Sequence, residues 1–115
     1  MNCNRSYPEI LPDVQREWER LSAEYTVPYY PHVTVGWDNN PRYMHLVGPI
    51  MKDNTPENFK KGLEMAKAWS DAHNDVPLIT INSWNEWTEM SYLEPDDVYG
   101  TGYLDAVREV FGPAE

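Results

Sequence analysis

The chain has 115 residues and a formal net charge of −10, with 19 acidic against 9 basic side chains. This excess of negative charge argues against nucleic acid and anionic membranes as partners, because both favour clustered Lys and Arg, whereas a neutral glycan stays compatible. The single cysteine, Cys3, excludes an internal disulfide and a cysteine-rich zinc site.

Targeting signals are missing from this segment of sequence. No apolar run approaches the roughly 18 residues of a membrane span, and residues 1–12 lack the apolar core of a signal peptide. Because a longer protein can carry such signals elsewhere, the localisation stays open, and so does the oligomeric state.

The first predicted element is an amphipathic helix over residues 12–25. Its apolar side chains recur at spacings of four, three and four among charged residues, at Val14, Trp18, Leu21 and Tyr25. An aromatic at helical spacing is typical of a core position, so Trp18 is interpreted as packing rather than function.

A strand over residues 32–36 follows, and a polar cluster comes directly after it, Trp37-Asp38-Asn39-Asn40-Pro41-Arg42. Ordinary turn chemistry and a binding pocket explain Asn39 and Asn40 about equally well, since Asp, Asn and Pro are what turns need. A pocket role is favoured for Trp37, Asp38 and Arg42.

A second helix is predicted over residues 56–72, because Thr55 is a capping residue and Pro56 suits the first helical position. A second strand follows near residues 78–83, and its run Leu78–Ile81 has no polar face, as expected of a parallel strand covered on both sides. A third helix is expected over residues 102–110. Strands joined by a helix should lie parallel, in the order helix, strand, helix, strand, helix.

Paired carboxylates are the candidates for catalysis. Glu86 and Glu89 follow the second strand, and a helical turn there would bring their Cβ atoms within about 5–6 Å of each other. The alternative is that both are solvated loop carboxylates, the usual fate of Glu. Aromatic and amide neighbours suit sugar rings and hydroxyls, so the expected substrate contacts here are Trp84, Asn85, Trp87, Tyr92 and Glu94.

The segments Trp84-Asn85-Glu86-Trp87-Thr88-Glu89 and Tyr92-Leu93-Glu94-Pro95-Asp96 resemble the C-terminal signature of the glycoside hydrolase family 99-like proteins, which include the WbsX-type polysaccharide-biosynthesis proteins. The upstream Trp-Asp-Asn-x-Pro-Arg stretch is similar to that family too. Met90 departs from the pattern, in which Gly often follows the second glutamate.

The resemblance implies a C-terminal fragment of a (β/α)8 TIM-type barrel, so that residues 1–115 form a single partial domain; a whole barrel takes about 250 residues. It also implies a retaining glycoside hydrolase acting on α-linked, mannose-containing glycans through a 2-hydroxyl-assisted mechanism, with Glu86 as base and Glu89 as acid. The family needs no metal or other cofactor. The three histidines likewise show no metal-binding spacing.

Two alternatives stay open. One is a glycosyltransferase or another role in cell-surface polysaccharide biosynthesis, and the other is a non-catalytic sugar-binding protein. In each case the partner is an oligosaccharide or polysaccharide. The paired glutamates favour an enzyme, because binding alone needs no proton donor and acceptor.

Overall fold

The computed structural model describes residues 4–114, so Cys3 lies outside the described residues. The described part is a mixed α/β fold with three long helices, α1 (Tyr7–Glu24), α2 (Pro56–His73) and α3 (Gly102–Phe111). The central strands are β2 (His32–Thr34) and β4 (Thr80–Asn82). The predicted order of helix, strand, helix, strand, helix is confirmed along the chain.

Helix α1 begins five residues before the predicted start at residue 12. Ser6 precedes the helix, and its backbone N–H donates to the Glu9 carboxylate at 3.2 Å, as in a capping box. Pro12 therefore lies inside the helix, where it removes one backbone hydrogen bond, rather than near its start. The other two helices agree with prediction to within one residue at each end.

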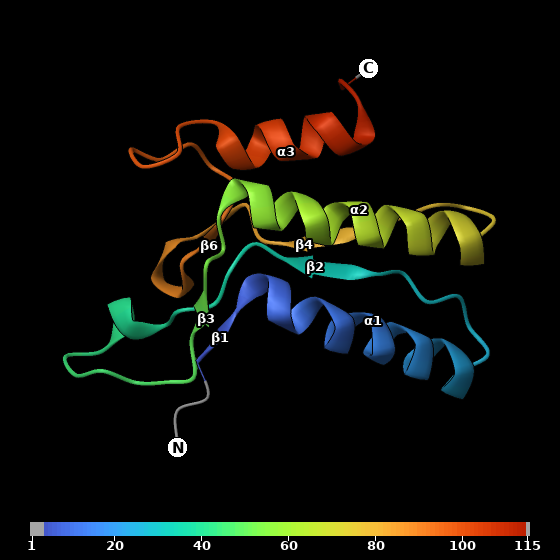
Figure 1. The fold of residues 1–115 in the computed structure, drawn as a ribbon, viewed down its shortest axis with the longest axis horizontal. Helices are drawn as coiled ribbons and strands as arrows, with labels where there is room; N and C mark the ends of the chain where they lie inside the picture. Colours follow the sequence, from blue (N-terminus) through green and yellow to red (C-terminus); the bar gives the residue numbers. More distant parts are fainter. Residues whose placement is uncertain (1–3, 115) are drawn as a thin grey trace.

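Strands β2 and β4 pair in parallel, with Val33 opposite Ile81. Figure 1 shows both strands running in the same direction and the three helices lying alongside them, with α2 between α1 and α3. Helix α2 connects the two strands along the chain, as a parallel pair requires. The prediction of parallel strands is confirmed.

The helices cover only one face of this sheet. Val33 and Val35 are buried against a core that includes Phe59 and Leu63, whereas His32 and Thr80 are exposed on the opposite face and bond to each other at 2.8 Å. The expectation that the Leu78–Ile81 run is covered on both sides does not hold in the described residues: β4 begins only at Thr80, which is exposed on the face opposite the helices, and Leu78, which precedes the strand, is 51% exposed.

Short strands complete the described fold. β1 (Arg5–Ser6) pairs in parallel with β3 (Met51–Lys52), and β5 (Asn85–Glu86) pairs antiparallel with β6 (Ser91–Tyr92). Two 3-10 turns, η1 (Asn40–Arg42) and η2 (Trp87–Glu89), lie in the loops that follow β2 and β4. These loops gather at the end of the molecule to which both central strands point (Figure 1).

Candidate active site at the strand ends

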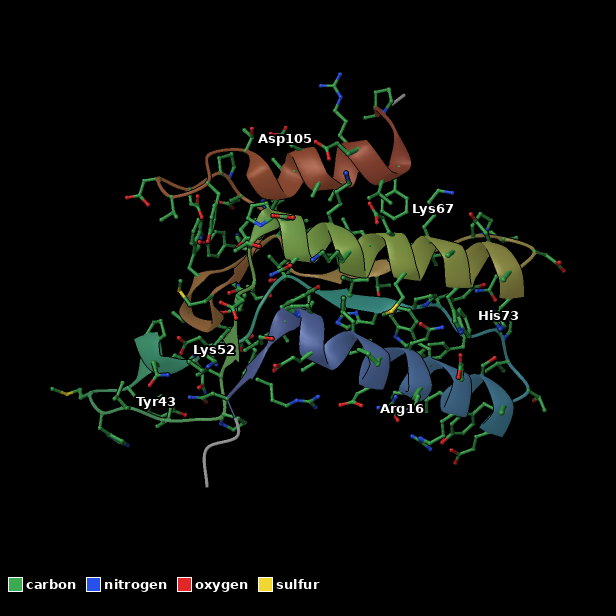
Figure 2. The ribbon with its side chains drawn as sticks, in the orientation of Figure 1. Arg16, Tyr43, Lys52, Lys67, His73 and Asp105 are labelled. Carbon is green, nitrogen blue, oxygen red and sulfur yellow. The ribbon has the colours of Figure 1, made fainter. Side chains whose placement is uncertain are left out.

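The loops that follow β2 and β4 are joined to each other. The backbone N–H of Asp38 donates to the carbonyl of Glu89 at 2.9 Å, which connects the two polar clusters predicted from the sequence. Figure 2 shows Tyr43 and Lys52 at this end and His73 at the other. Because β2 and β4 are parallel, their C-terminal ends lie at the same end of the sheet. Trp37 and Trp84, which follow these strands, therefore lie at that end as well.

Glu86 and Glu89 meet at a single guanidinium. Nη2 of Arg42 lies 3.0 Å from Oε1 of Glu86 and 3.1 Å from Oε1 of Glu89. The turn η2 brings the two glutamates onto one side, as the helical alternative for this segment required. The Glu89 side chain is 18% exposed and that of Glu86 is 44% exposed, so Glu89 is the more enclosed of the two.

Thr88 belongs to the same hydrogen-bond network, although its sequence position gave no reason to single it out. Its hydroxyl oxygen accepts from Nε of Arg42 at 2.8 Å and its hydroxyl donates to Oε1 of Glu86 at 2.9 Å. The only available signal was that Thr88 stands between the two glutamates. Such a position favours contact once the chain turns.

Aromatic residues flank the two glutamates along the chain. Trp84 and Trp87 are 54% and 41% exposed, which leaves indole surface open to a sugar ring. Trp87 stacks on Tyr92 with ring centroids 4.0 Å apart, and Tyr92 itself is buried. Tyr92 therefore lies beneath Trp87 and supports it. Trp37 is exposed as well, close to the β2 end.

The other predicted residues occupy different positions. The Asp38 carboxylate accepts from the backbone and side-chain amide of Asn40, and Asn40 in turn bonds to both the N–H and the C=O of Val47. Asp38 and Asn40 thus form a turn. The bonds between Asn40 and Val47 close the loop over residues 40–47, which includes Arg42. Of the two explanations weighed for Asn40, turn chemistry accounts for its contacts.

Asn85 and Glu94 are tied to this region through their backbones. Asn85 is exposed and pairs with Tyr92 across the β5–β6 ribbon. The N–H of Glu94 donates to the carbonyl of Trp84 at 3.1 Å, and its side chain is half-buried. Among the described residues, the recorded contacts of the Arg42 guanidinium are with Thr88, Glu86 and Glu89, not with Asn85 or Glu94.

The loop after β6 is organised by Asp96. Burial and a 2.6 Å hydrogen bond to Asp96 raise the pKa of the Tyr92 hydroxyl well above its usual range. Partial desolvation alone raises the pKa of Asp96, but hydrogen bonds from the Tyr92 hydroxyl and the N–H groups of Tyr99 and Val98 outweigh it and hold the pKa below its usual value. An ionised Asp96 thus fixes the loop behind Trp87.

Two properties of residues 4–114 bear on ligands and membranes. No group of three or more His, Cys, Asp and Glu side chains in this range is placed to hold a metal ion. None of the helices in this range is long and apolar enough to span a bilayer.

Residues 4–107 match the family model described as Glycosyltransferase WbsX. The chain belongs to this family, a carbohydrate-active enzyme family, which confirms the resemblance drawn from the glutamate motif. It is 36% identical over 103 residues to the Uncharacterized protein WxcX of Xanthomonas campestris pv. campestris, in strains B100 and ATCC 33913 alike.

That match covers 88% of this chain and 14% of each relative, so the chain spans a small part of the length of these curated proteins. No solved structure matches the chain significantly.

Proposed function

We propose that this chain supplies the acid/base carboxylates of an enzyme that breaks and re-forms glycosidic bonds during assembly of a cell-surface polysaccharide. The observation that carries the proposal is the meeting of Glu86 and Glu89 at one guanidinium, beside exposed tryptophans. Family membership supports a role in polysaccharide biosynthesis over free hydrolysis.

The two carboxylates stand close enough to act on one sugar ring. Because both Oε1 atoms contact the same nitrogen, these two oxygens are at most about 6 Å apart. The spacing rule that separates retaining from inverting glycosidases applies where a carboxylate or a water attacks the anomeric carbon, not where the substrate's own hydroxyl does.

The resemblance implies the route. Glu86 accepts the proton of the substrate's 2-hydroxyl, whose oxygen bonds to the anomeric carbon, while Glu89 gives a proton to the departing glycosidic oxygen. The resulting anhydro sugar is opened by a hydroxyl that attacks the anomeric carbon and gives up its proton to Glu89, while the bond from the anomeric carbon to the 2-oxygen breaks and the 2-oxygen takes back the proton held by Glu86. A sugar hydroxyl in that position gives transfer, and water gives hydrolysis.

The barrel belongs to the same proposal. We place the chain as the C-terminal βα units of a (β/α)8 barrel, in which catalytic groups stand at the carboxyl ends of the strands. The parallel β2–β4 pair, the connecting helix α2 and the position of both polar loops at one strand end support this assignment.

A hydrolase of α-linked, mannose-containing glycans is the second candidate, and the carboxylate pair favours it as much as transfer. A complete protein carrying this chain should be incubated with an α-linked manno-oligosaccharide labelled at its reducing end, and the products separated by mass spectrometry. Longer products support transfer, shorter products alone support hydrolysis, and binding without turnover supports a sugar-binding protein.

Variants of the two glutamates test the chemistry itself. Glu86→Gln and Glu89→Gln should each lower turnover by about two orders of magnitude or more, with sugar binding largely retained. Glu64→Gln, on the exposed side of α2, is the matched control and should leave turnover unchanged. Full activity of either site variant would contradict the proposed function.

A further inference from the structure

The guanidinium of Arg42 contacts three protein side chains. Its Nε donates to Thr88 at 2.8 Å, and its Nη2 lies 3.0 and 3.1 Å from the Glu86 and Glu89 carboxylates. A guanidinium has five N–H donors in a rigid planar fork; here two of them donate, to Thr88 and Glu86, and the contact with Glu89 is an ion pair. The sequence suggested a substrate-binding role for Arg42, but these contacts join Arg42 to the two glutamates.

We infer that Arg42, assisted by Thr88, is a positioning residue that holds the two carboxylates at a fixed separation; the inference rests on the proposed function of Glu86 and Glu89. Glu86 ends β5 and Glu89 ends the turn η2 that follows it, so both stand on a short segment with little structure of its own. The guanidinium ties both side chains to the loop that follows β2.

Thr88 makes the arrangement asymmetric. Oε1 of Glu86 accepts from both Arg42 and the Thr88 hydroxyl, at 3.0 and 2.9 Å, whereas Oε1 of Glu89 meets Arg42. Glu86 is the more exposed carboxylate, and it receives the additional donor. Loss of the Thr88 hydroxyl should therefore release Glu86 and leave Glu89 in place.

A structural test requires no substrate. Crystal structures of a complete protein carrying this chain should be compared for wild type, Arg42→Lys and Thr88→Val. Lysine has no fork and cannot reproduce two directed hydrogen bonds together with an ion pair, so both carboxylates should occupy more than one conformation in Arg42→Lys, and Glu86 alone in Thr88→Val. Unchanged carboxylate positions in both variants would overturn the inference.

The control is another arginine that bridges two glutamates. Arg20, on α1, lies 2.6 Å from Glu17 and 2.5 Å from Glu24, remote from the strand ends. Arg20→Lys should leave the carboxylates of Glu86 and Glu89 in their wild-type positions.

Kinetics with the labelled manno-oligosaccharide distinguish positioning from substrate binding. Arg42→Lys should lower kcat by about ten- to a hundred-fold with KM within about two-fold of wild type, and Thr88→Ser should restore most of the activity lost in Thr88→Val. A raised KM with unchanged kcat would assign Arg42 to substrate instead. If Glu86→Gln stayed fully active, the proposed function would fail, while the crystallographic comparison would still decide whether Arg42 orders the carboxylates.

Discussion

Asp96 shows how a single ionised side chain stabilises the candidate site. Its carboxylate accepts from the Tyr92 hydroxyl and from the N–H groups of Val98 and Tyr99. The Tyr92 ring in turn stacks on Trp87, so contacts connect the loop of Asp96 to the tryptophan between the two glutamates. Asp96 belongs to the signature segment read from the sequence, and the folded loop shows which groups its charge binds.

A pH dependence follows from the lowered pKa of Asp96. Because the folded pKa lies below the unfolded value of about 3.9, the stabilisation is present above that value and is lost as pH falls through the folded pKa. Asp96→Asn cannot titrate, so its melting temperature should lie below that of wild type near pH 6 and approach it near pH 3. A difference that stays constant between these two pH values would contradict this account.

At the scale of elements, close approach between β2 and the glutamate loop is made possible by Gly36. A Cβ added there would lie 2.6 Å from the carbonyl oxygen of Met90 and would also collide with the Asn54 side-chain amide. Since Met90 directly follows Glu89, the absence of a side chain at Gly36 lets the loop that carries the glutamates settle against the end of the strand.

Gly36→Ala should therefore destabilise the fold by about 1–3 kcal/mol, the usual range for overpacking a filled site. Thermal unfolding would measure the loss, and sugar binding followed by tryptophan fluorescence would show whether the loop has moved. An unchanged melting temperature together with unchanged binding would mean that the loop adjusts without cost.

At the scale of the whole molecule, the β2–β4 sheet has two strands in the described residues, and its second face is exposed. An apolar groove of about 250 Å³ lies between α1 and β2, lined by residues that include Leu11, Val14 and Val33. Unpaired strand edges and open apolar surface favour association with other chains.

The 115-residue chain by itself should accordingly self-associate and show no glycosyl transfer or hydrolysis. Light scattering and the labelled manno-oligosaccharide assay measure the two properties, and a complete protein that contains this chain serves as the positive control. A monodisperse, active monomer of 115 residues would contradict this prediction.

The sequence by itself determined the local features of this protein. The three helices, the positions of β2 and β4 and the capping role of Thr55, whose hydroxyl accepts from the Asn58 N–H at 3.2 Å, follow from short-range periodicity and capping chemistry. The family followed from the glutamate motif, because that motif is contiguous in sequence.

The tertiary structure alone decided which of the candidate residues meet. Arg42 and Glu86 are 44 positions apart, and their contact depends on the register of two parallel strands and on the turns that follow them. The same long-range geometry places the Thr88 hydroxyl against Arg42, 46 positions away. Packing between distant segments decides which side chains become partners, and it leaves no periodic signal in the sequence. The residues of the site were therefore predictable, but their contacts with one another were not.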